Sequence, residues 1–170
     1  MPKLIKLYVR YIDTLNRTVG RIAMYLIFVM MGVLLFSAIT RSIFDVSHIW
    51  VIEMAQFTMA AYYLLGGGYT LQNDAHVRMD LLYERWPVKK QAFADSLTAF
   101  CLILYLGVLL YGGYSSTEYA LEYGQKNYSA WGPPMAPIKI IMTVGIILML
   151  LQAIAIFFRD LAAARGKSIS

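Results

Sequence analysis

Long stretches without a charged residue alternate with short charged segments along this chain. A bilayer core about 30 Å thick is crossed by about 20 helical residues that rise about 1.5 Å each. Buried helices of soluble proteins are usually shorter and keep a polar face. The pattern therefore predicts an all-α integral membrane protein with a single domain over residues 1–170. The four predicted transmembrane helices cover residues 22–40, 54–73, 96–117 and 140–158.

The segment before the first span, residues 1–21, has a different pattern. Basic residues recur every three or four positions, and apolar residues fill the positions between them. This spacing predicts an amphipathic helix in the cytoplasmic interface, with its cations near lipid phosphates and its apolar face among acyl chains or against a neighbouring helix. Two interpretations stay open: a general anchor to the membrane surface, or a strut that docks on a partner subunit.

The distribution of basic residues predicts the orientation in the membrane. Five precede the first predicted span, four lie between spans two and three, and three follow span four, whereas the other two loops share three. Because basic residues are enriched on the cytoplasmic side of membrane proteins, both termini and the middle loop are expected in the cytoplasm. No small-residue cleavage site follows span one before Arg41, so we expect a retained anchor and not a signal peptide.

Composition supports a membrane protein and excludes several kinds of chemistry. The chain is 59% hydrophobic with a net charge of +5, and basic residues beside spans reflect topology and anionic lipids, not nucleic acid. The single cysteine, Cys101, excludes a dithiol enzyme, and His48 and His76 stand outside any metal-ligand spacing. No phosphate-binding glycine motif or nucleophile elbow is present. We therefore expect no enzymatic activity and no metal or other cofactor in this chain.

A transport pathway through the chain is not expected either. Carriers and channels usually place an ionisable residue in the middle of the membrane, and the four predicted spans contain none. The nearest carboxylates lie at the span edges, where they can reach water or lipid headgroups. They are Glu53, Asp74, Asp95 and Glu118. Four helices without an internal charge indicate a scaffold more than a pump.

Three polar clusters lie next to the predicted spans. Taken singly, each has an ordinary explanation as interfacial aromatic residues, snorkelling cations or a proline-containing turn. The first cluster links spans one and two and contains Arg41, Trp50 and Glu53. The second is at the exit from span two and consists of glycines 66–68, which lie inside the span, and of His76, Arg78 and Asp80, which follow it. The third leads into span four and consists of Trp131, Pro133, Pro134, Pro137, Lys139, Gly145 and Gln152.

In this order the clusters resemble the small membrane subunit of tripartite ATP-independent periplasmic (TRAP) transporters, the DctQ type. That family has an arginine at the end of span one, then a tryptophan and a glutamate at the start of span two. A His-x-Arg-x-Asp-like signature follows span two, and a tryptophan and proline segment precedes span four. The resemblance covers nearly the whole chain. One departure is Val51 and Ile52, which stand where relatives often have another acidic residue, so a pair of carboxylates is missing there.

The resemblance implies a function that the residues alone do not. It implies a scaffold subunit in the bacterial inner membrane, partnered by a larger permease subunit and a periplasmic substrate-binding protein. The larger subunit would import a carboxylate-type substrate by an elevator motion driven by a sodium gradient. Two other classes stay open: a structural subunit of another membrane complex, and a small homodimeric four-helix exporter. The exporter would need an acidic residue in span one, which this chain lacks.

Two groups of residues are expected to have interface roles. Arg41 and Glu53 are expected to brace the outer ends of spans one and two, as an ion pair or as separate snorkelling side chains. The periplasmic segment 119–137 is expected either to dock the binding protein or to act only as an aromatic belt. Docking is favoured where charges of both signs surround aromatic residues, and the residues that supply them here are Glu122, Lys126, Trp131 and Lys139.

Overall fold

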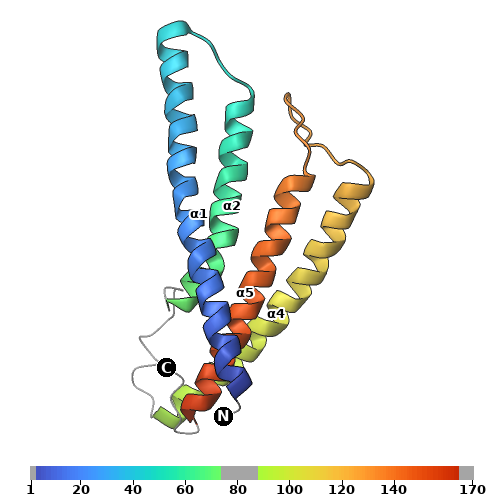
Figure 1. The fold of residues 1–170 in the computed structure, drawn as a ribbon. Helices are drawn as coiled ribbons and strands as arrows, with labels where there is room; N and C mark the ends of the chain where they lie inside the picture. Colours follow the sequence, from blue (N-terminus) through green and yellow to red (C-terminus); the bar gives the residue numbers. More distant parts are fainter. Residues whose placement is uncertain (1–2, 74–87, 165–170) are drawn as a thin grey trace.

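The computed structural model describes residues 3–73 and 88–164, and these residues form long helices (Figure 1). The helices are α1 (Lys3–Phe44), α2 (Trp50–Gln72), α4 (Val88–Glu122) and α5 (Ala136–Ala164). Within the described ranges there is no strand, and a single isolated β-bridge joins Lys126 to Pro134. The predicted all-α architecture is therefore confirmed for this part of the chain.

Three of the helices are long and apolar enough to cross a membrane, over Ile5–Phe44, Leu97–Glu122 and Ala136–Arg159. The remaining helix, α2, has 23 residues and so a length of about 34 Å, which is enough to span a bilayer core. Glu53, several polar side chains and the glycines 66–68 leave α2 without a stretch as apolar as the most apolar stretches of the other three helices. The sequence prediction rested on the absence of charge, and so it grouped α2 with the more apolar spans.

Helix α1 is continuous over 42 residues, a length of about 63 Å. It contains residues 3–21 of the predicted amphipathic segment and the whole predicted span 22–40, so the boundary expected near residue 21 is not a break in the helix. The reason is that no proline lies inside α1 to remove a backbone hydrogen bond. Residues 3–21 therefore form the first half of a longer helix.

The helices form two antiparallel hairpins that converge at one end and splay apart at the other (Figure 1). One hairpin is α1 with α2, and the second is α4 with α5; α2 packs on α5, and α1 reaches α5 near the chain ends. The start of α1 and the end of α5 lie at the convergent end (Figure 1). The segments 45–49 and 123–135, which connect the helices of each hairpin, lie at the splayed end.

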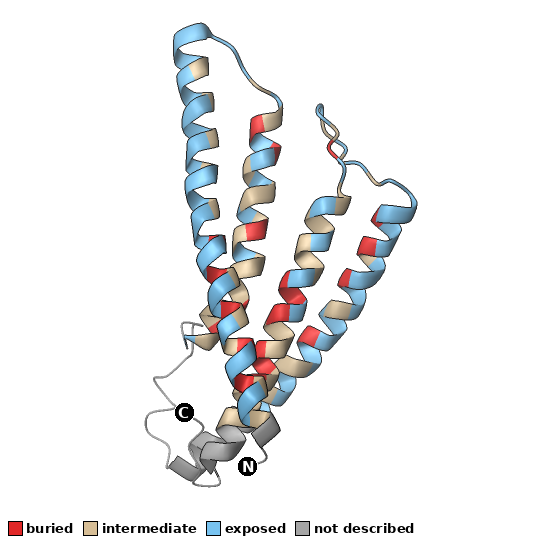
Figure 2. Cartoon of the chain, viewed as in Figure 1, coloured by how far each residue is buried: buried red, intermediate tan, exposed pale blue. Residues whose placement is uncertain are grey.

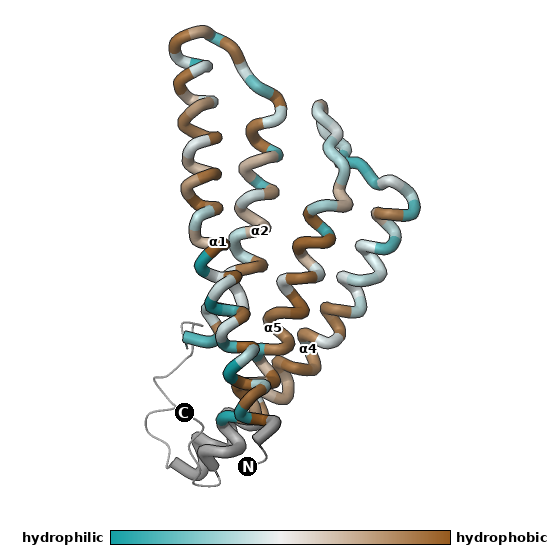
Figure 3. Tube along the Cα trace, viewed as in Figure 1, coloured by the Kyte–Doolittle hydropathy of each residue, from teal (hydrophilic) through white to brown (hydrophobic). Residues whose placement is uncertain are grey.

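Buried residues occur along α2, α4 and α5 and in the lower part of α1, whereas the upper part of α1 is almost wholly exposed (Figure 2). That upper part is also strongly apolar (Figure 3).

Contact between α2 and α5 depends on small residues, because a Cβ placed on Gly145 would lie 2.7 Å from the Leu64 carbonyl oxygen. A Cβ on Gly67 would lie 2.6 Å from Met149 Sδ. Such close approach through glycine is typical of helix packing in membranes.

The connection between α4 and α5 is a compact hairpin. Gly124 has a φ of +57°, and the Gln125 N–H donates to the Ala120 carbonyl over 3.2 Å, which is how a glycine in the left-handed region ends a helix. The Met135 N–H then donates back to the Gln125 carbonyl over 2.9 Å. Pro137 lies in the first turn of α5, where the missing N–H interrupts no helical hydrogen bond.

Candidate functional site

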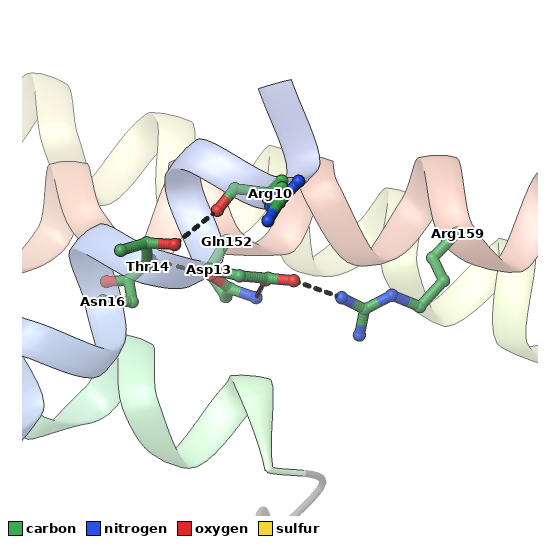
Figure 4. Close-up of polar contacts among 6 residues, drawn as sticks. All are labelled: Arg10, Asp13, Thr14, Asn16, Gln152 and Arg159. Atoms are coloured by element: carbon green, nitrogen blue, oxygen red, sulfur yellow. Dashed lines mark hydrogen bonds and ion pairs between the residues drawn. The ribbon is translucent and has the colours of Figure 1, made fainter. Parts of the chain in front are cut away.

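A row of polar side chains joins α1 to α5 near the chain ends (Figure 4). Asn16 Nδ2 donates to Gln152 Oε1 over 2.8 Å, and Gln152 Nε2 donates to Asp13 Oδ1 over 2.9 Å. The second oxygen of that carboxylate, Asp13 Oδ2, lies 2.6 Å from Arg159 Nη2. We call these four residues the α1–α5 polar row. Its contacts fix the register of the two helices.

The inner end of the α1–α5 polar row is fully enclosed. Asn16 is 1% exposed and Gln152 is 0% exposed, and buried amides are costly unless they are hydrogen-bonded. Each amide therefore makes burial of the other tolerable. Asn16 Oδ1 has no hydrogen-bond donor, and it lies so close to Gly68 of α2 that a Cβ on this glycine would collide with it. Asn16 thus marks the point where α1, α2 and α5 meet.

Apolar contacts support the outer end of the row. Val9 and Ile12 of α1 are buried with Ala155 of α5. The Tyr8 hydroxyl donates to the Leu151 carbonyl over 3.2 Å. The apolar face of the N-terminal segment therefore packs against a neighbouring helix, α5 of the same chain, which is one of the two surroundings expected from the sequence.

A second polar group joins α4 to α5 at the splayed end. The hydroxyl oxygens of Thr117 and Thr143 lie 2.8 Å apart, and Thr117 also donates to the Lys139 carbonyl over 3.1 Å. The Lys139 ammonium donates to Gln125 Oε1 over 2.6 Å and to the Ser116 carbonyl over 3.2 Å. Lys139 therefore ties the start of α5 to the end of α4, and its charge is engaged inside the chain.

Arg41 and Glu53 do not form an ion pair. Arg41 is exposed in the last turn of α1, whereas Glu53 is 7% exposed in the first turn of α2 and its Oε2 has no hydrogen-bond partner. The proposal of a direct pair is wrong for this structure. Their shared position at the outer ends of the first two predicted spans suggested it, but the two side chains differ in environment, since Arg41 is exposed and Glu53 is enclosed. The start of α2 is itself a suitable place for a carboxylate, because the helix dipole is positive there.

Trp50 belongs to an aromatic row that connects the two helices of the first hairpin. The ring of His48 lies 5.5 Å from the ring of Phe36 in α1 and 6.0 Å from the ring of Trp50, measured between centroids. Edge-on and tilted contacts at these distances are favourable. The half-buried Trp50 thus helps to hold the short connection between α1 and α2.

The connecting hairpin presents an exposed surface at the splayed end. Glu122 and Lys126 are exposed, Trp131 is 45% exposed and the ring of Tyr128 is fully exposed. Pro133 is buried and Pro134 is exposed, and the Asn127 N–H donates to the Pro133 carbonyl over 2.9 Å. The charged and aromatic side chains expected there are therefore available on a hydrogen-bonded turn.

Some expected residues are outside the described part of the chain. These are His76, Arg78 and Asp80, which belong to the second cluster of the sequence. Among the residues that the structure does describe, no group of three His, Cys, Asp or Glu side chains could hold a metal ion.

Sequence reasoning missed most of the α1–α5 polar row. It singled out Gln152 through the family resemblance but assigned no contact to Asp13. Asn16 and Arg159 were not assigned a contact. The available signal was weak: Gln152 is a lone amide in an apolar helix, and Asn16 follows Ile12 by one helical turn on the same face.

The fold and these contacts define a helical membrane subunit whose polar side chains join helix to helix. The family of the tripartite ATP-independent periplasmic transporters, DctQ component, matches residues 9–163. The chain therefore belongs to the DctQ family, a membrane component of TRAP transporters, and it is not an enzyme. Comparison with curated proteins gives no significant match.

Proposed function

We propose that this chain is the scaffold subunit of a TRAP transporter in the bacterial inner membrane. In this proposal a larger permease subunit carries a carboxylate-type substrate, driven by a sodium gradient, and a periplasmic binding protein delivers that substrate. The chain itself holds no substrate, sodium ion or cofactor. Family membership supports the assignment to a tripartite system, and the substrate class and sodium coupling follow from the resemblance described above.

One structural observation supports the scaffold role over an independent carrier. The polar side chains between the described helices are used to join them, as in the contacts of Asn16 with Gln152 and of Thr117 with Thr143. A carrier needs polar or ionisable groups that line a path for its substrate. An elevator-type partner needs a fixed wall, and a helical unit braced by these contacts at both ends suits that task.

We further propose that α2 crosses the membrane with the other three helices and that both termini are cytoplasmic. Consecutive helices of each hairpin are antiparallel, and the start of α1 and the end of α5 lie at the same end. If α1, α4 and α5 cross the bilayer, α2 must cross it too, because it returns the chain from the splayed end to the convergent end. Single cysteines at Lys90 and Lys126 test this in intact cells with an impermeant thiol reagent. Lys126→Cys should react and Lys90→Cys should not; the reverse pattern would invert the topology.

The exposed apolar surface supports a partner within the membrane. Large apolar side chains of α1 and α4 are exposed along much of each helix, among them Phe28, Leu35, Leu104 and Val108. Lipid and the larger subunit would share this surface. Coexpression with a larger permease subunit and affinity purification through a tag on this chain test the association. A stable complex is expected, and failure to copurify under mild detergent would contradict it.

A further inference from the structure

Four basic residues of α1 share one side of the helix. Lys6, Arg10, Arg17 and Arg21 are all exposed, and a helix that turns by about 100° per residue places them within an arc of about 60°. In the described part of the chain, none of these side chains takes part in an ion pair or hydrogen bond. They form two pairs of i and i+4 neighbours, and neighbours at this spacing are about 5–6 Å apart between Cβ atoms.

The two pairs lie at different depths. Arg17 follows Asn16, which contacts Gln152 of α5. Along α5, Gln152 lies seven residues before Arg159, a distance of about 10 Å along the helix axis. Arg159 is the first charged residue after the apolar run of α5, so Arg17 and Arg21 lie beside its apolar part. In contrast, Tyr8, between Lys6 and Arg10, contacts the ring of Phe158 at the end of that run. Lys6 and Arg10 therefore lie at the membrane boundary, and Arg17 and Arg21 lie deeper in the membrane.

Charges at this depth need an anion within reach. Side chains of a helix lean toward its N-terminus, so the guanidinium groups of Arg17 and Arg21 extend toward the convergent end of the molecule, where headgroups of the nearer leaflet lie. Arginine binds phosphate oxygens through two parallel hydrogen bonds, and two arginines one turn apart can hold a single phosphate between them. No acidic side chain of the described residues forms an ion pair with either arginine, and Asp13, one turn before Arg17, is paired with Arg159.

The same side of α1 continues as an apolar stripe. Met24, Phe28 and Leu35 follow Arg17 by 7, 11 and 18 residues, which keeps them on one face of the helix. All three are exposed. A pair of cations followed by an apolar stripe matches the shape and chemistry of a phospholipid, with the phosphate near the convergent end and an acyl chain along the helix.

We propose that α1 holds one anionic phospholipid, with its phosphate between Arg17 and Arg21 and an acyl chain along Met24, Phe28 and Leu35. The assignment of this lipid to the inner leaflet rests on the proposed cytoplasmic termini. Charge complementarity favours a lipid because the cations and the apolar stripe form one continuous face. The competing occupant is an acidic side chain of the larger subunit. It would explain the two unpaired arginines but not the apolar stripe that follows them on the same face.

The test measures retained lipid on the complex with the larger subunit. The complex is equilibrated in nanodiscs of phosphatidylglycerol and phosphatidylcholine, extracted, washed in 0.5 M NaCl and weighed by native mass spectrometry. The salt in the wash shortens the Debye length to about 4 Å. Lipid that is attracted only over longer distances is therefore removed. Each cation near an anionic lipid raises the affinity for that lipid about fivefold. The two arginines together should therefore favour retention of phosphatidylglycerol over phosphatidylcholine by about 25-fold.

Matched variants separate the site from general attraction. Arg17→Gln/Arg21→Gln should abolish the preference, whereas Lys6→Gln/Arg10→Gln removes the same charge at the same spacing and should keep most of it. Arg17→Lys/Arg21→Lys should give an intermediate preference. If the double glutamine variant does not accumulate, each single glutamine variant should lower the preference about fivefold.

Two results would overturn the proposal. One is an unchanged preference in Arg17→Gln/Arg21→Gln. The other is loss of the larger subunit from this variant with lipid retention unchanged in the remaining chain, which would assign the arginines to the partner. Uptake is a separate readout, so a transport failure with intact lipid retention would count against the proposed function and not against the lipid site.

Discussion

Replacing Gly145 by alanine should separate α2 from α5. The added Cβ would lie 2.7 Å from the carbonyl oxygen and 2.9 Å from the carbonyl carbon of Leu64. Because these are backbone atoms of a helix, no side-chain rotation relieves the contact. The helices must move apart by about 0.7 Å to reach an ordinary contact distance of 3.4 Å. Overpacking of this kind usually costs about 1–3 kcal/mol, and the better helix propensity of alanine offsets at most about 1 kcal/mol of it.

The control is Gly112→Ala, since a Cβ on Gly112 of α4 meets nothing within 4 Å. Thermal unfolding of the purified complex, followed by intrinsic fluorescence, is the assay. A loss of 1–2 kcal/mol corresponds to a fall in Tm of about 2–8 °C for a chain of this size. Gly145→Ala should show that fall and Gly112→Ala should not. Equal melting temperatures for Gly145→Ala and the unmodified chain would refute the packing argument.

Three further predictions concern the polar contacts. Gln152→Leu should lower Tm because the buried Asn16 amide then keeps only its 3.5 Å hydrogen bond to the Leu148 carbonyl, at a cost of about 1–3 kcal/mol. Adding Asn16→Leu should recover part of the loss. Glu53→Gln should leave Tm unchanged or higher, because the carboxylate is enclosed with one oxygen unpartnered; a marked fall would reveal a stabilising charge. Glu122→Lys with Lys126→Glu should lower uptake when the binding protein is limiting, and uptake should recover when the binding protein is in excess. Unchanged uptake at every concentration would show that this surface does not dock the binding protein.

The helices could be predicted from the sequence because a bilayer sets a length for apolar segments. The run 140–158 lies inside α5, and the run 22–40 lies inside α1. The start of α1 could not be placed from composition, since a basic amphipathic segment and an apolar span can form one continuous helix when no proline divides them. Its relation to α5 depends on tertiary contacts and not on local pattern.

The α1–α5 polar row shows why side-chain contacts were harder to predict. Asn16 and Gln152 are separated by 136 residues, and nothing in either local segment names the other as partner. The opposite error occurred at Arg41 and Glu53, which are close in sequence but lie in different environments. Lys139 was expected to contribute charge to a docking surface, yet its ammonium is occupied by Gln125 and the Ser116 carbonyl. One side-chain acceptor and one backbone acceptor hold the ammonium, and they come within reach of it only in the folded hairpin.

The scaffold account is tested most directly by uptake into proteoliposomes that contain the larger permease subunit, with and without this chain. With both subunits, the binding protein and an inward sodium gradient, uptake of the carboxylate substrate should occur and should not require ATP. The larger subunit without this chain should lose most uptake, and this chain alone should transport nothing. Robust transport by the isolated chain, or full transport without it, would contradict the account.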